Sequence, residues 1–154
     1  MVIADLPSVA GIPLDVVELK PKRREAAVAQ LLAAAHARGA VLEPDVVLAA
    51  LAHRELLGST AIGKGCALAA VRSMGVRHEH YVLGRSARGV EWHAPDGEPV
   101  QLVLLALAPA TQPAATHLDL LARLASALRA QRSRARLLEG DTALVASLLE
   151  GRPA

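Results

Sequence analysis

The sequence has almost no aromatic residues. Among its 154 residues there is no phenylalanine, and Tyr81 and Trp92 are the single tyrosine and the single tryptophan. Proteins that bind single-stranded nucleic acid stack its bases on aromatic side chains, and this chain offers no such platform. Basic residues do cluster at 20–24 and 129–136, where they could meet nucleic acid or an acidic partner, but the net charge is only +2. We expect no nucleic-acid partner and interpret both clusters as solvated charge at helix ends.

Cysteine and long apolar segments are also scarce. Cys66 is the only cysteine, which excludes an internal disulfide and a cysteine-rich zinc site. No uninterrupted apolar run, including the one at 102–108, exceeds seven residues, whereas a membrane-spanning helix needs about 20. No stretch near the N-terminus combines a basic start, an apolar centre and a cleavage site. We therefore expect a soluble cytoplasmic protein with no membrane insertion, and the length suits a single domain over residues 1–154.

Three stretches carry apolar residues at helical spacing. The first helix is predicted over 24–38. The second opens at 43–45 and ends near Gly58, because proline and acidic residues favour a first turn. The third opens at 116–119, which has the form of a capping box and puts His117 at the first helical position. Its predicted buried face consists of Leu118, Leu121, Ala122, Ala125 and Leu128.

Extended segments are predicted at 16–19, 66–70 and 100–107. The last is short and almost entirely apolar, so we interpret it as the central buried strand. The many polar residues at 78–93 indicate an edge strand with a turn at 86–89. Alternating helices and strands favour an α/β fold with helices on both faces of the sheet.

The densest cluster of glycines lies between the second helix and the strand at 66–70. Gly58, Gly63 and Lys64 match the start of the phosphate-binding loop G-x-x-x-x-G-K-[ST], but Gly65 stands where that loop needs a hydroxyl. The loop also requires a strand before it and a helix after it, and the order here is reversed. We therefore exclude a nucleotide-binding loop and expect a tight turn over 58–65.

The same stretch, residues 54–70, resembles the signature of the type-2 enzyme IIA domains of the sugar phosphotransferase system, the fructose, mannitol and nitrogen-regulatory group. In that family the string is R-E-x-x-G-S-T-x-x-G-x-G-x-A-x-P-H, and its final histidine accepts a phosphoryl group from the carrier protein HPr. Here Ala69 and Ala70 stand where the family has Pro-His. The resemblance implies a mixed parallel and antiparallel sheet of the enzyme IIA mannitol/fructose type, with Ala70 at the phosphohistidine position.

The resemblance further implies an anion-binding pocket made of Arg54, Ser59, Thr60 and His117. His117 matches the second histidine of the family, which flanks the phosphohistidine. By position alone, Arg54 would be an exposed arginine that offsets the partial negative charge at the end of its helix, and His117 would be a surface residue. With the resemblance, we expect these residues to converge in space.

Other candidate sites carry less specific patterns. His78 and His80 form a His-x-His pair that could bind a metal with Glu91 or His93, but no further ligand stands at a diagnostic spacing. We expect no metal site and no cofactor. Cys66 has no neighbouring base or cation in the sequence that would lower its pKa, so we predict a small buried core residue rather than a nucleophile.

Phosphoryl transfer through an enzyme IIA requires an imidazole nitrogen as the nucleophile, and alanine has no nucleophilic atom. We therefore expect a nitrogen-regulatory-type homologue that has become a pseudoenzyme in a bacterial cytoplasm. It would bind proteins such as an HPr-like carrier, a transporter or a sensor kinase. Two alternatives stay open. One is a phosphocarrier that uses His78, His80 or His117, and the other is a sensor of an anion or metabolite in the retained pocket.

Overall fold

The computed structural model describes residues 6–151, and the outer ends of the expected domain, 1–5 and 152–154, lie outside this range. The strands are β1 Ser8–Val9, β2 Ile12–Glu18, β3 Ala61–Gly63, β4 Cys66–Ser73, β5 His80–Val90 and β6 Val100–Pro109. The helices are α1 Arg24–Ala37, α2 Pro44–Leu57, α3 Ala114–Arg129, the 3-10 helix η2 Gln131–Ser133, α4 Arg134–Glu139 and α5 Thr142–Leu149. None of the described helices is long and apolar enough to cross a membrane.

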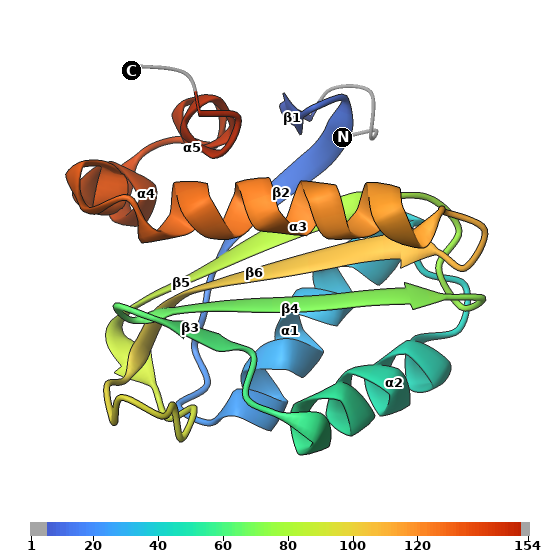
Figure 1. Ribbon diagram of the computed structural model, residues 1–154, viewed down its shortest axis with the longest axis horizontal. Helices are drawn as coiled ribbons and strands as arrows, with labels where there is room; N and C mark the ends of the chain where they lie inside the picture. Colours follow the sequence, from blue (N-terminus) through green and yellow to red (C-terminus); the bar gives the residue numbers. More distant parts are fainter. Residues whose placement is uncertain (1–5, 152–154) are drawn as a thin grey trace.

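The strands form one mixed sheet in the order β1-β2-β5-β6-β4-β3. β2 runs parallel to β5 and β4 runs parallel to β6, whereas β5 and β6 are antiparallel to each other. The hairpins β1-β2 and β3-β4 close the two edges. As Figure 1 shows, α1 and α2 cover one face of the sheet and α3, α4 and α5 cover the other. The expected α/β fold, with a mixed sheet and helices on both faces, is therefore confirmed.

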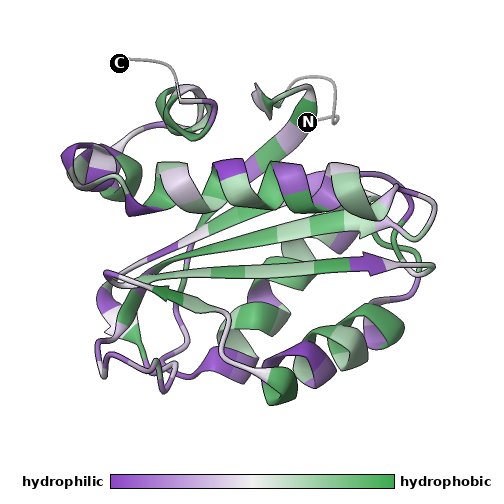
Figure 2. Ribbon diagram, viewed as in Figure 1, coloured by the Kyte–Doolittle hydropathy of each residue, from purple (hydrophilic) through white to green (hydrophobic). Residues whose placement is uncertain are grey.

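β6 lies at the centre of the core. Every residue of its segment 102–108 is at most 3% exposed. Alternate side chains of the strand pack into two apolar clusters, one beneath α1 and α2 and the other beneath α3, α4 and α5. Figure 2 shows the apolar strands between the two helical layers. The prediction of a central buried strand at 100–107 is confirmed.

β5 is an interior strand between β2 and β6, so the edge strand predicted from the polar residues at 78–93 is wrong. The sequence pattern misleads because His80, at the start of β5, is buried against a polar partner from a distant strand. The predicted turn at 86–89 is also wrong. β5 continues to Val90 through an irregularity in its pairing with β6 after Arg85.

α1 and α2 follow the sequence prediction. α1 buries one apolar face, and α2 begins at Pro44 after the connection 38–43. The chain ends with two short helices, α4 and α5. Asp141 caps α5, because its side chain accepts a hydrogen bond from the backbone N–H of Leu144 at 2.9 Å.

α3 begins earlier than the capping-box pattern predicts. Pro113 is the N-cap, with a φ of −59°, and no side chain caps the helix. The helix therefore starts at Ala114, and Thr116 lies inside its first turn. The backbone N–H of His117 donates to the carbonyl of Pro113 at 3.1 Å. The prediction that His117 sits at the first helical position, among exposed amides, is therefore wrong.

The buried face of α3 also differs in part from the predicted one. Leu124 and Leu128 are buried, but Leu118 is 65% exposed. The reason is that α3 packs through its C-terminal half, where Leu124 and Leu128 meet Leu137 and Val145 of the last two helices. The N-terminal half of α3 borders a pocket instead of the core.

A buried polar network joins β2, β5 and α1. His80 is 0% exposed, and its Nε2 donates to Asp15 Oδ2 at 3.0 Å. Arg38, at the end of α1, donates to both oxygens of the same carboxylate. Within the described part of the chain, Nδ1 of His80 has no hydrogen-bond partner. Burial lowers the pKa of His80, although the hydrogen bond and the charge of Asp15 act in the opposite direction.

This network predicts that the protein loses stability in mild acid. Above the ordinary histidine pKa of 6.5, His80 is neutral in both the folded and the unfolded chain. Below that value the unfolded chain takes up a proton that the folded chain resists, so the free energy of unfolding falls until the lowered pKa is reached. His80→Gln keeps a side-chain N–H for Asp15 and removes the titration. Urea unfolding of both proteins should show that their difference in the free energy of unfolding becomes smaller as the pH falls below 6.5. A difference that stays constant with pH would contradict the prediction.

Candidate functional site

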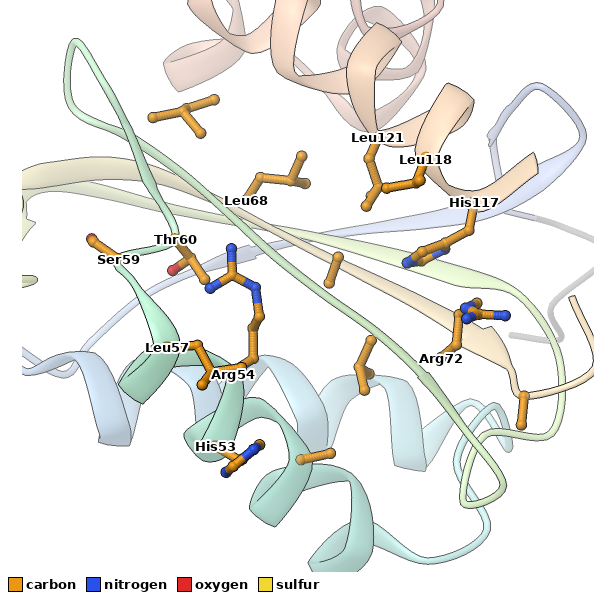
Figure 3. Close-up of a pocket in the computed structure, with 15 residues that line it drawn as sticks. His53, Arg54, Leu57, Ser59, Thr60, Leu68, Arg72, His117, Leu118 and Leu121 are labelled. Carbon is orange, nitrogen blue, oxygen red and sulfur yellow. The ribbon is translucent and has the colours of Figure 1, made fainter. Parts of the chain in front are cut away.

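A pocket of about 630 Å³ lies between α2, the β3-β4 hairpin and the first turns of α3. Arg54, Ser59, Thr60 and His117 all line it, and so does Ala70. Figure 3 shows Arg54 rising from α2 on one side of the pocket and His117 approaching from α3 on the other. The structure thus brings His117 together with Arg54, Ser59 and Thr60, which lie far from it in the sequence, as we expected.

Arg54 closes the end of α2. Its guanidinium donates to the carbonyl of Gly58 at 2.8 Å, just beyond the last helical residue. A cation is favoured there because the helix carries a partial negative charge at its C-terminus. A guanidinium has five N–H donors, and this contact leaves others for the pocket that Arg54 borders.

Glu55 fixes the loop that follows α2. Its carboxylate accepts from the backbone N–H of Thr60 at 3.0 Å and from the Thr60 hydroxyl at 2.6 Å. Trp92 donates its indole N–H to the same hydroxyl at 3.1 Å. Because the single hydroxyl hydrogen of Thr60 already goes to Glu55, the side chain of Thr60 shapes the wall of the pocket rather than donating to a ligand. Ser59 differs, since its hydroxyl oxygen accepts from the N–H of Ala61 at 3.1 Å. Among the described residues, no acceptor is assigned to its own hydroxyl hydrogen.

The glycine-rich segment forms a hairpin rather than the single tight turn predicted over 58–65. β3 pairs with the start of β4, and the chain turns at Lys64 and Gly65 with φ angles of 57° and 73°. A Cβ at Gly65 would lie 2.5 Å from a guanidinium nitrogen of Arg134. The glycine therefore lets Arg134 pack against the turn, where it donates to the carbonyl of Lys64 and to the side chain of Gln101.

β4 carries Ala70 to the pocket. Its side chains alternate, so that Cys66, Leu68 and Ala70 face the α3 side while Ala67 and Ala69 face α1 and α2. This is the alternation expected for the strand. β3 pairs only with Cys66 and Ala67, so the rest of β4 is free to border the pocket. At position 70 the strand offers the pocket a methyl group.

His117 faces the pocket with one ring nitrogen already engaged. Its Nδ1 lies 3.0 Å from Oε1 of Gln112, and an amide oxygen only accepts, so Nδ1 carries the hydrogen. A neutral ring then has its lone pair on Nε2. Burial lowers the pKa of His117, and the nearby charge of Arg72 adds to this effect. Arg72 in turn donates to the backbone carbonyl of Gln112 at 2.8 Å, so Gln112 holds both side chains.

Cys66 lies in the core and does not line this pocket. Its side chain is fully buried, and burial raises the pKa of the thiol, although Arg134 acts in the opposite direction. Both observations fit the predicted core residue. His78 and His80 have ring centroids 6.1 Å apart. Within residues 6–151, no group of three or more His, Cys, Asp or Glu side chains could hold a metal ion.

The chain matches a known protein family over most of its length. The model of the family described as "Phosphoenolpyruvate-dependent sugar phosphotransferase system, EIIA 2" matches residues 13–150. The chain belongs to this family. The PTS system fructose-specific EIIA component of Haloferax volcanii is 30% identical over 142 residues, which cover 92% of each chain. The nitrogen regulatory protein of Bradyrhizobium diazoefficiens is 39% identical over 85 residues, or 55% of each chain.

Solved structures of EIIA 2 relatives share the fold. The nitrogen regulatory protein IIA-Ntr from Neisseria meningitidis has a TM-score of 0.77 and 28% identity, covering 88% of this chain and 92% of that one. The enzyme IIA of the complex between enzyme IIAMTL and phosphorylated enzyme IIBMTL from Escherichia coli has a TM-score of 0.71 at 22% identity, covering 90% and 95%. At that identity the second likeness supports the fold alone. The family and the fold type expected from the sequence are confirmed.

Sequence reasoning missed several residues of this EIIA 2 pocket. Arg72 and His53 also line it, while Glu55 and Gln112 hold its members in place. Arg72 had a signal, because it stands two residues after Ala70 on the same strand and therefore on the same face. Gln112 had none, since it lies in the loop before α3 and acts through contacts that only the folded chain makes.

We predict that removing the Thr60 hydroxyl destabilises this EIIA 2 domain by about 1–3 kcal/mol, because the Trp92 N–H and the Glu55 carboxylate would each lose a buried partner. Thr60→Val preserves the shape of the side chain and deletes the hydroxyl. Chemical denaturation of the variant and the parent protein measures the loss. Ser59→Ala is the matched control from the neighbouring position and should cost clearly less. Equal losses of unfolding free energy in the two variants would mean that the Glu55-Thr60-Trp92 hydrogen bonds do not stabilise the protein more than the Ser59 contact does.

Proposed function

We propose that this protein is a nitrogen-regulatory-type enzyme IIA homologue that has lost its phosphorylatable histidine and acts by binding other proteins. The observation that carries the proposal is Ala70. It lines the pocket between Arg54 and His117, at the position where the family signature has its phospho-acceptor. A methyl group has no lone pair with which to attack phosphorus, and no electrostatic help from its surroundings replaces a nucleophile.

The other polar groups of the pocket support a loss limited to the nucleophile, because they are still present. Arg54 and Arg72 bring two guanidinium groups to its edge, and His117 is held by Gln112. Ser59 retains a hydroxyl hydrogen that can point toward a ligand. In our proposal these groups form the retained anion site, while Thr60 keeps its place as a wall residue fixed by Glu55.

The surface beside the pocket supports a protein partner. Leu57 and Leu118 are 73% and 65% exposed, and both line the pocket. Exposed apolar side chains gathered around a polar hollow are typical of protein interaction sites. In our proposal the partner is a transporter or a sensor kinase in the cytoplasm of a bacterial host, as the resemblance to the nitrogen-regulatory group implies. A version without the acceptor would bind such a target constitutively.

Our first functional prediction is that phosphorylated HPr transfers no phosphoryl group to this protein. After incubation, intact-protein mass spectrometry should show the unmodified mass alone. An enzyme IIA with the family's Pro-His pair serves as the positive control for the donor. An added phosphoryl mass that is lost in acid would contradict the prediction, because acid lability is typical of phosphohistidine.

Such a result would favour a second candidate function, a phosphocarrier that uses His117. The structure gives a specific reason to prefer this histidine, since its Nδ1 is bound to Gln112 and its Nε2 has the lone pair. His80 is fully buried and engaged with Asp15, so it cannot meet a carrier protein while the chain is folded. In that case His117→Gln would abolish the modification and His78→Gln would not.

We further predict that Ala70→His restores at least partial phosphorylation by HPr, because the anion site would again have an imidazole beside it. Ala69→Pro with Ala70→His rebuilds the family pair, but proline removes a backbone donor from β4, so the single variant is tested alongside. Ala70→Gln is the control, being similar in size and without a nucleophile. Adding Arg54→Gln to Ala70→His should lower the rate by roughly 100-fold, the order expected for one preorganised donor.

Titration with HPr separates the two ways in which the rebuilt variant could fail. If HPr does not bind, the docking surface has changed, and the failure says nothing against the anion site. If HPr binds and no phosphohistidine forms, then Arg54 and His117 are not arranged around a phosphoryl group, and the retained site in our proposal is wrong.

A further inference from the structure

A second hollow lies on the opposite side of α3 from the pocket. This groove, of about 930 Å³, runs between the C-terminal half of α3, the η2-α4 segment and α5. Figure 1 shows these elements gathered at one end of α3. Arg123, Ser126 and Ala127 of α3 line the groove, whereas His117 and Leu118 line the pocket. At 3.6 residues per turn the two sets lie on opposite sides of the helix, so the groove is a separate surface.

Three arginines from three different elements line the groove, namely Arg123 of α3, Arg132 of η2 and Arg136 of α4. In the part of the chain that the structure describes, neither Arg132 nor Arg136 takes part in an ion pair. Arg123 pairs with Asp119 at 3.3 Å, but both side chains are largely exposed, and such pairs are weak enough to exchange partners. These residues belong to the basic cluster at 129–136, which the pocket does not use, and to its extension at Arg123.

The opposing negative charge in the groove is small. Glu150 is the acidic residue among those that line it, and its carboxylate accepts a hydrogen bond from the backbone N–H of Ala10 at 2.9 Å. The groove therefore has an excess of positive charge. Its walls also include apolar side chains, those of Ala127, Leu148 and Leu149.

We propose that this groove binds an acidic segment of a partner protein, one that carries aliphatic side chains between its carboxylates. Guanidinium groups suit carboxylates because the two planar groups can form paired hydrogen bonds. The apolar walls favour a peptide over a nucleic-acid backbone, and no aromatic residue lines the groove to stack with bases. A concave surface also fits a peptide better than a flat membrane. Because the groove and the pocket face opposite ways, a partner can occupy the groove whatever happens at Ala70.

The test uses the full chain and a short fluorescein-labelled peptide of alternating glutamate and leucine, followed by fluorescence anisotropy. We expect saturable binding that weakens as salt is added. Arg132→Glu with Arg136→Glu should weaken the binding by roughly tenfold or more, since reversed charges in a binding site repel the ligand. Arg77→Glu with Arg88→Glu is the matched control, because both arginines are exposed, lie outside the groove and give the same change in net charge. The control should keep its affinity within about twofold, a change of less than 0.5 kcal/mol.

Four comparison ligands decide whether the recognition is specific. A peptide with glutamine in place of glutamate should not bind, and polyglutamate without leucine should bind more weakly. A single-stranded oligonucleotide and vesicles with anionic lipids should bind more weakly than the peptide. If polyglutamate, the oligonucleotide or the vesicles bind at least as well, the groove is a general anionic-polymer surface and the proposal is overturned. Equal loss of binding in the control double variant would overturn it as well.

Discussion

The carboxylate of Glu55 determines where the chain goes after α2, and the candidate pocket depends on that path. The carboxylate takes both the backbone N–H and the hydroxyl of Thr60, and Trp92 donates to the same hydroxyl. The end of α2, the β3-β4 hairpin and the segment after β5 are thereby joined at one point. Arg54 precedes Glu55 and borders the pocket, and β4 leaves the hairpin in the direction that brings Ala70 to it. A change at Thr60 would therefore move residues of three elements, although Thr60 itself need not touch a ligand.

Much of this fold could be predicted from the sequence, because local patterns decide the course of α1, α2, β4 and β6. Apolar spacing, the proline that opens α2 and the short apolar run of β6 all indicate the structure that forms. The failures have two causes, contact between distant parts of the chain at β5 and a local effect of proline at α3. β5 reads as an edge strand because its histidine is polar, and only the position of Asp15 on the neighbouring strand shows that His80 can be buried. α3 starts early because Pro113 sets the backbone before the threonine that looks like a cap.

The candidate pocket was predictable in its members and less so in their roles. The family signature points to Arg54, Ser59, Thr60 and His117, and the structure gathers all four. Their hydrogen bonds then divide them. Thr60 is committed to the framework, Arg54 serves both the end of α2 and the pocket, and His117 is oriented by Gln112, a residue without any sequence signal. Within our proposal, the parts that attract an anion and the part that reacts with it are separate residues, so one can be lost while the others stay.

Gly65 bears on how members of this family are recognised. Its φ of 73° favours a residue without a side chain, and a guanidinium nitrogen of Arg134 lies where a Cβ would come close. That preference comes from the hairpin turn and from α4, and it holds whether or not a phosphoryl group ever reaches the pocket. Part of the signature is thus an architectural requirement, which the fold imposes whether or not a member carries an acceptor histidine. Sequence searches that rely on such glycines will therefore group members with and without an acceptor histidine. The side chain at position 70 is the better criterion for separating them.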